Sequence, residues 1–80
     1  MSTFAKTIKK YEKECLKNDI PAETVIAYLL EISQRERYDL FMHIDDEMPE
    51  ALANEFHAGM ERILKQEPMA HVLGYSWFYG

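Results

Sequence analysis

The chain is 80 residues long, with 48% hydrophobic residues, 29% charged residues and a net charge of −5 at pH 7. This length supports one small domain. The hydrophobic fraction is large enough for a core, and the charged fraction argues against a disordered chain. The single cysteine, Cys15, excludes an internal disulfide framework and favours a reducing compartment, so we expect a cytoplasmic protein. No stretch approaches the ~20 apolar residues of a membrane span, so no membrane partner is expected.

Charge is distributed unevenly along the chain. Residues 1–18 carry five lysines and two glutamates, whereas residues 19–80 carry four basic and twelve acidic residues. Four of the lysines recur at helical spacing: Lys6, Lys10, Lys13 and Lys17. Such a row could meet phosphate, but no aromatic residues are interleaved with it and the acidic body opposes a polyanion. We therefore expect a solvated helix face and no direct nucleic-acid partner.

Two helices are predicted in the first half of the chain. The first begins at a cap on Ser2 or Thr3 and ends near Asn18. Its apolar residues form one narrow stripe with a period of 3.6 residues: Phe4, Ile8, Tyr11 and Cys15. Pro21 opens the second helix, because proline needs no amide hydrogen in the first turn, and this helix ends near Ile32. Its wide apolar face predicts a central position: Val25, Ile26, Leu29, Leu30 and Ile32.

A capping-box pattern predicts where the third helix begins. The sequence Ser33-Gln-Arg-Glu36 places a serine three residues before a glutamate, so each side chain could bond the other residue's amide. The chain is therefore expected to stop and restart at Ser33, with a helix over about residues 34–43. Three apolar residues are expected to face inward, with the direction of Leu40 left open: Tyr38, Phe41 and Met42.

Two further helices are predicted after an acidic turn at residues 45–47. Pro49 opens a long helix that ends near Lys65, with these residues on its buried side: Leu52, Phe56, Met60, Ile63 and Leu64. Pro68 opens a last short helix, and Gly74 is well placed as its left-handed C-terminal cap. The sequence thus predicts an all-α fold, a compact bundle of four to five short helices over residues 1–74.

The last six residues have the pattern of a β-strand rich in aromatic side chains. Four aromatic residues fall within five positions: Tyr75, Trp77, Phe78 and Tyr79. A lone strand is not stable in isolation. We therefore expect this strand to begin a β-hairpin whose partner lies further along a larger protein, so that the chain would be the front part of that protein.

The residue types that carry chemistry do not form a recognisable site. The three histidines lack the spacing of metal ligands, and Cys15 falls on the apolar stripe, where a free thiol behaves as a small hydrophobic group. The sequence also has no glycine-rich phosphate loop and no Ser/His/Asp pattern. We therefore expect no catalytic, cofactor-binding or metal-binding residue within these 80 residues.

A motif at the end of the chain resembles a known family. It comprises Arg62, Glu67, Pro68, Leu73, Gly74, Phe78, Tyr79 and Gly80. This frame resembles the end of the N-terminal domain of the HemK/PrmC methyltransferases, and the upstream helices fit the same pattern. The chain departs from the family pattern at Ile63, where a second arginine is usual, at Gln66, where glycine is usual, and at His71, where tyrosine is usual.

The resemblance implies a helical N-terminal domain at residues 1–74 and the start of a hinge hairpin at residues 75–80. A catalytic domain that binds S-adenosylmethionine would follow. The full enzyme would methylate the side-chain amide of the glutamine in the Gly-Gly-Gln motif of class 1 peptide release factors. The helical domain would dock this protein substrate, with the acidic turn as one candidate surface, and would not itself catalyse the reaction.

The resemblance also assigns interdomain contacts to the end of the chain: Gly74, Trp77, Phe78, Tyr79 and Gly80. An alternative from a different functional class is a free-standing helical interaction module that dimerises through its exposed aromatic residues. The oligomeric state distinguishes the two hypotheses, because the module would form a tight dimer that buries Trp77.

Overall fold

The computed structural model describes residues 3–73 and contains five helices in that range. They are α1 (Phe4–Lys17), α2 (Glu23–Ser33), α3 (Arg37–Met42), α4 (Glu50–Leu64) and α5 (Met69–Leu73). The described residues form no sheet, and their one β-type pairing is an isolated antiparallel bridge between Thr3 and Glu47. The predicted all-α class and the predicted number of helices are confirmed.

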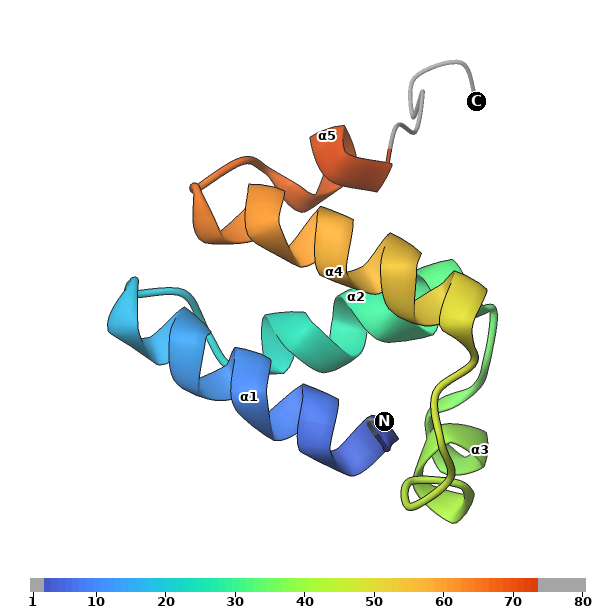
Figure 1. The fold of residues 1–80 in the computed structure, drawn as a ribbon. Helices are drawn as coiled ribbons and strands as arrows, with labels where there is room; N and C mark the ends of the chain where they lie inside the picture. The colour runs from blue at the N-terminus through green and yellow to red at the C-terminus, as the bar shows by residue number, and fades with distance from the viewer. Residues whose placement is uncertain (1–2, 74–80) are drawn as a thin grey trace.

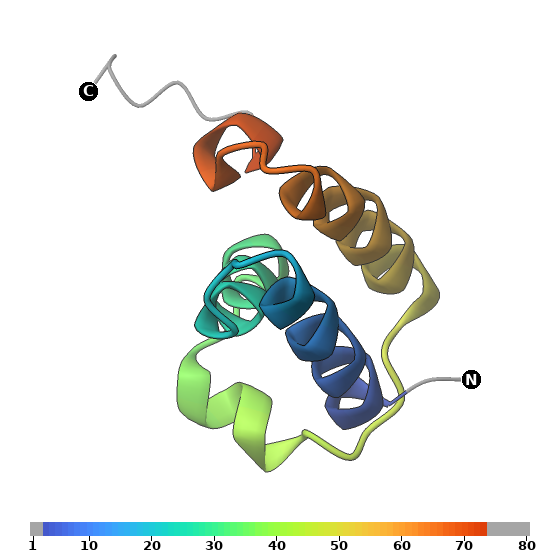
Figure 2. The same ribbon diagram turned by 90° about the vertical axis from the view of Figure 1, so that its left-hand side faces the viewer.

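Three helices form the body of the molecule (Figure 1). α2 packs against both α1 and α4, which also contact each other, and α5 packs on the outer side of α4. α3 lies at one end of this body, close to the start of α1 and to the segment that leads into α4, as the view in Figure 2 also shows. None of the helices in residues 3–73 is long and apolar enough to cross a membrane.

The core comes from the stripes that the sequence predicts on the long helices. All four predicted residues of α1 are buried: Phe4, Ile8, Tyr11 and Cys15. On α4, Phe56, Met60 and Ile63 are buried, while Leu52 and Leu64 pack against the core at its edge. α2 contributes Val25, Leu29 and also Tyr28, a residue that the apolar pattern did not single out.

Phe56 forms the aromatic centre of this core. Its ring is fully buried, meets the ring of Tyr11 edge to face at 5.4 Å and stacks on the ring of Tyr28 at 5.8 Å. Gly59, one turn further along α4, is also buried, and a Cβ atom there would overlap the ring of Tyr28. Because Gly59 has no side chain, α2 and α4 can pack with the tyrosine ring directly against the α4 backbone.

The start of α1 is capped twice. Thr3, one of the two predicted caps, accepts a hydrogen bond from the amide of Lys6 through its hydroxyl at 3.2 Å. The first two helical amides are satisfied from a distant segment, since Phe4 N–H donates to the Asp46 carbonyl at 3.0 Å and Ala5 N–H donates to the Ile44 carbonyl at 2.8 Å. These bonds fix the acidic turn against the start of α1, because the amides have no partner within the helix.

The predicted capping box is wrong. Ser33 is the last residue of α2, and its buried hydroxyl has no hydrogen-bond partner. Gln34 ends the helix in a left-handed conformation (φ 59°), its amide bonds the Leu30 carbonyl, and its side chain donates to the Glu31 carbonyl. This backbone closure is a common helix end, and it leaves α3 to begin at Arg37.

The predicted orientation of α3 is also wrong. Tyr38, Phe41 and Met42 are 68%, 47% and 73% exposed, whereas Leu40 is fully buried. Residues i, i+3 and i+4 share one face of a helix, and residue i+2 lies on the opposite face. Because this short helix lies at the end of the bundle, it turns the Leu40 side to the core, and the three larger side chains face outward.

The predicted helix starts at proline are close to the observed ones. α4 begins directly after Pro49 and α5 directly after Pro68, whereas α2 begins two residues after Pro21. Gly74, the predicted cap of α5, and the predicted strand at residues 75–80 lie outside the described residues.

Candidate functional site

The predicted interdomain residues are not part of the described structure. Gly74, Trp77, Phe78, Tyr79 and Gly80 all follow the last described residue, so their predicted contacts stay a prediction. The structure does describe the first half of the same motif, residues 62–73. It also describes three surfaces that a partner could reach: the lysine face of α1, the outer face of α3 and a cleft beside α5.

The connection between α4 and α5 is held in a sharp turn. Gln66, which stands where the family motif usually has glycine, adopts a left-handed conformation with φ of 71°. Glycine adopts this conformation without a steric cost, so the glycine expected from the resemblance would also fit this turn. In this chain the glutamine side chain makes an additional hydrogen bond. Its Nε2 donates to the Asn18 carbonyl at 2.9 Å, which links this turn to the α1–α2 connection.

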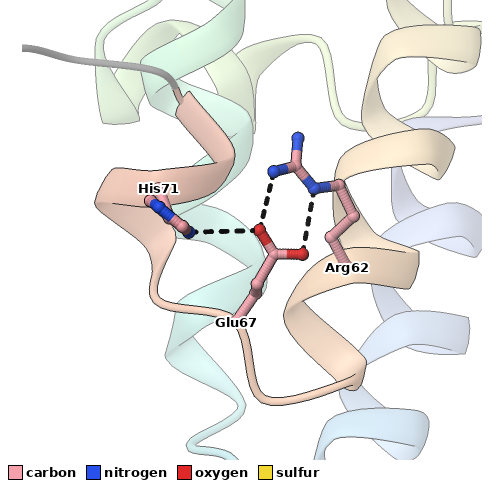
Figure 3. Close-up of polar contacts among 3 residues, drawn as sticks. All are labelled: Arg62, Glu67 and His71. Carbon is pink, nitrogen blue, oxygen red and sulfur yellow. Dashed lines mark hydrogen bonds and ion pairs between the residues drawn. The ribbon is translucent and has the colours of Figure 1, made fainter.

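Three polar side chains, one from each end of the turn and one from α5, meet here (Figure 3). Arg62 on α4 donates to Glu67 through Nε at 3.1 Å and through Nη2 at 2.6 Å. His71 on α5 approaches the same carboxylate, with Nδ1 3.4 Å from Oε2. A two-point contact between guanidinium and carboxylate restrains direction as well as distance. The contact from Arg62 to Glu67 therefore restrains the turn between α4 and α5.

The charges in this cluster shift the pKa values of its members in opposite directions. The hydrogen bonds from Arg62 hold the pKa of Glu67 below its ordinary value, and the positive charge of Arg62 and the contact with His71 act in the same direction. The carboxylate in turn raises the pKa of Arg62. Ionised Glu67 is thus the form that the folded protein favours.

We expect Arg62→Ala to raise the pKa of Glu67 towards the ordinary glutamate value of 4.5, because the hydrogen bonds that stabilise the carboxylate are lost. The stabilisation by this pair is complete above about pH 4.5 and is lost as the pH falls through the lower pKa of folded Glu67. An NMR titration of the Glu67 carboxyl carbon measures the change. Lys65→Ala, which removes a neighbouring cation, serves as the control, and an equal shift in both variants would contradict the assignment.

The residues that could carry catalysis or bind metal have ordinary partners. Burial raises the pKa of the Cys15 thiol, and the nearby charges of Glu12 and Glu14 add to this shift, so the reactive thiolate is disfavoured. His57 accepts or donates a 2.5 Å hydrogen bond with the Tyr11 hydroxyl. Within residues 3–73, no three side chains of histidine, cysteine, aspartate or glutamate come together as a metal site would require.

The outer face of α1 is basic, as the lysine row predicts. The five lysines are exposed: Lys6, Lys9, Lys10, Lys13 and Lys17. Leu16 lies among them with 64% of its surface exposed. The ammonium group of Lys10 also lies 5.2 Å from the centre of the Tyr11 ring. This face is solvated in the structure, and it can attract an anionic partner only against the negative charge of the rest of the chain.

The outer face of α3 combines apolar and acidic groups. Three of the four most exposed large hydrophobic side chains in residues 3–73 lie here, namely Tyr38, Phe41 and Met42. Residues 36–50 also carry six carboxylates and a single arginine. His43 lies between two of these acids, with Nδ1 3.0 Å from Asp46 and Nε2 3.8 Å from Asp39. We call Tyr38, Phe41, Met42 and the acidic turn at residues 45–47 the α3 surface.

A cleft of about 400 Å³ lies between the α1–α2 connection and the turn that precedes α5. Ile20, Ala27, Ile63 and Met69 are among the apolar residues that line it, and the acidic residues around it are Asp19, Glu23 and Glu67. Ile63 stands where the family motif usually has a second arginine, and in this chain its side chain belongs to the core. The cleft is open to solvent and offers apolar contact beside negative charge.

Comparison with known proteins identifies the family. The PrmC N-terminal domain matches the chain over residues 7–74. The release factor glutamine methyltransferase of Staphylococcus aureus (strain NCTC 8325 / PS 47) is 35% identical over 52 residues, which are 65% of this chain. The same match covers 19% of that enzyme, so the chain spans about a fifth of the length of this curated relative. No solved structure matches the chain.

These matches confirm the resemblance that the motif at residues 62–80 suggested. The family match begins within α1 and extends past the end of α5, so it includes most of α1, the other four helices and the Arg62–Glu67 pair. The matched residues are thus the ones whose helices pack around a single core in the structure. The chain belongs to the PrmC N-terminal domain family.

Proposed function

We propose that this chain is the N-terminal domain of a longer methyltransferase that modifies class 1 peptide release factors. The observation that carries the proposal is the family match over residues 7–74, together with a relative named as a release factor glutamine methyltransferase. The methyl acceptor would be the glutamine of the Gly-Gly-Gln motif, and the reaction would take place in the cytoplasm.

In this proposal the helical domain binds the protein substrate, and the chemistry belongs to a separate domain. S-adenosylmethionine would supply the methyl group there and would not contact residues 1–74. Residues 75–80 would begin the hinge between the two domains, with Gly74, Trp77, Phe78, Tyr79 and Gly80 contacting the catalytic domain. The Arg62–Glu67–His71 cluster supports this arrangement, because it restrains the helix that leads into the hinge.

Docking by such a domain would raise the rate of methylation, because it positions the release factor relative to the catalytic domain. A release factor that is held at two places loses its translational and rotational freedom on binding and not in the transition state. The expected signature is therefore a large effect on the methylation of whole release factors. A short peptide that contains the Gly-Gly-Gln motif cannot reach both domains, so its methylation should not depend on residues 1–65.

The test compares the full-length enzyme with a variant that lacks residues 1–65. We expect the deletion to weaken release-factor binding by at least about tenfold, as loss of a specific contact surface does, while methylation of the short peptide continues at a similar rate. The peptide assay shows that the remaining domain is folded and active. Undiminished affinity for the whole release factor would refute the docking role.

A further inference from the structure

We propose that the α3 surface is the docking site for a positively charged protein segment that carries an apolar anchor. The inference rests on the proposed function and specifies which face of the domain the release factor contacts. The segment would place its apolar side chain against Tyr38, Phe41 and Met42, and its lysine or arginine residues near the acidic turn at residues 45–47.

The first support is the exposure of three large side chains on one helix face. Tyr38, Phe41 and Met42 lie at positions i, i+3 and i+4, so they form one continuous patch. They are between 47% and 73% exposed, although the chain buries comparable side chains on its longer helices. Aromatic residues and methionine are enriched at the centres of protein interfaces, where they bind by losing contact with water.

The second support is the sign of the charge around the patch. Residues 35–50 carry six carboxylates and two arginines, so the segment that carries the patch has a net negative charge. A negative rim attracts a positive partner and repels nucleic acid and anionic membranes. A symmetric dimer through this face would place the same acidic rims opposite each other. The charge pattern therefore favours a basic protein segment over a second copy of the chain.

The third support is that the surface is already held in place. The carbonyl groups of Ile44 and Asp46 accept hydrogen bonds from the start of α1, which fixes the backbone of the acidic turn. Leu40 and Met48 are buried on either side of the turn. The guanidinium of Arg35, just before α3, lies 5.1 Å from the centre of the Phe4 ring. A preorganised surface loses little conformational freedom on binding.

The experiment measures the affinity of the full-length enzyme for a release factor by calorimetry at several salt concentrations. One variant, Phe41→Ser with Met42→Ser, removes the apolar patch, and another, Asp45→Lys with Glu47→Lys, reverses the charge of the turn. The matched controls are Leu16→Ser, an exposed leucine on α1, and Glu61→Lys, an exposed acid on α4. Because all of these positions are exposed, the melting temperature of each variant should match that of the parent enzyme.

We expect the apolar variant to weaken binding by about tenfold or more. The charge variant should weaken binding most at low salt and make the affinity less dependent on salt concentration. The two control variants should bind the release factor with an affinity within about twofold of that of the parent enzyme. Thr24→Arg, which projects into the cleft beside α5, should also bind normally if α3 is the contact surface.

The other outcomes separate this inference from the proposed function. If deletion of residues 1–65 abolishes binding but the α3 variants bind normally, the docking role stands and the α3 inference is refuted. If the deletion has no effect, the proposed function itself fails. The inference is also refuted if the α3 variants dissociate a dimer in light scattering, because the occupant would then be a second copy. It is refuted as well if α3 exchanges its amide hydrogens more slowly in the free full-length enzyme than in the isolated helical domain, because the occupant would then be the enzyme's own catalytic domain.

Discussion

Replacement of Phe56 by alanine is expected to lower the free energy of unfolding by about 4 kcal/mol. The ring is fully buried between Tyr11 and Tyr28, so its removal leaves a cavity that neither tyrosine can fill without losing its own contacts. A domain of this size has a total stability of roughly 4 to 12 kcal/mol. The substitution should therefore remove about a third or more of the stability of the domain.

Urea denaturation followed by circular dichroism measures this effect. Phe41→Ala is the matched control, because it removes the same ring from an exposed position, and it should change the stability by less than about 0.5 kcal/mol. Phe56→Leu keeps most of the side-chain volume and should lower the free energy of unfolding by about 1 to 1.5 kcal/mol. This variant gives a measurable value if the alanine variant does not fold. Equal losses at positions 41 and 56 would contradict the observed packing.

Gly59→Val is expected to lower the free energy of unfolding by about 3 kcal/mol, although valine has a higher helix propensity than glycine. The new Cβ would occupy the position of the Tyr28 ring, and that buried ring would have to move away from Phe56. The cost therefore arises at the contact between α2 and α4. Thermal and urea denaturation both measure it.

Ala58→Val is the control for this substitution, because position 58 is exposed on the same helix. This control should lower the free energy of unfolding only by the difference in helix propensity between alanine and valine, about 0.5 kcal/mol. On a Tyr28→Leu background, Gly59→Val should cost less than in the parent chain, since the two side chains no longer compete for the same space. An unchanged cost on that background would show that the glycine has another role.

The sequence predicted the long helices well because their apolar residues recur with one clear period. The stripe of α1 and the buried residues Phe56, Met60 and Ile63 of α4 lie where the pattern placed them. Tyr28 was missed because the predicted face of α2 was defined by its aliphatic residues alone, and Gly59 was missed because glycine has no side chain to contribute to the hydrophobic pattern. Their contact with each other depends on two helices that are distant in the sequence.

The third helix shows where local patterns fail. A capping box describes an interaction between neighbouring residues, but at Ser33 the chain ended α2 with a left-handed Gln34. A helix of six residues has fewer than two turns, so its apolar residues are too few to define a buried face by their period. The direction of Leu40 was therefore decided by the position of α3 at the end of the bundle.

The candidate site was likewise predicted only in part from the sequence. The motif at residues 62–74 was visible in the sequence and led to the family, but its ion pair between Arg62 and Glu67 is a property of the folded turn. The α3 surface was only partly anticipated, because the acidic turn was a candidate for docking whereas Tyr38, Phe41 and Met42 were assigned to the core. Exposure depends on what the rest of the chain covers.

The sequence by itself determined the all-α class, the number of helices, the buried stripes of α1 and α4 and the family, because each of these is encoded in residues that are close together in the chain. The tertiary structure decided the orientation of α3, the contact of Tyr28 with Gly59 and the hydrogen bonds from α1 to the acidic turn. These features depend on which distant segments meet, and a helical period of 3.6 residues fixes only the relative directions of side chains within one helix.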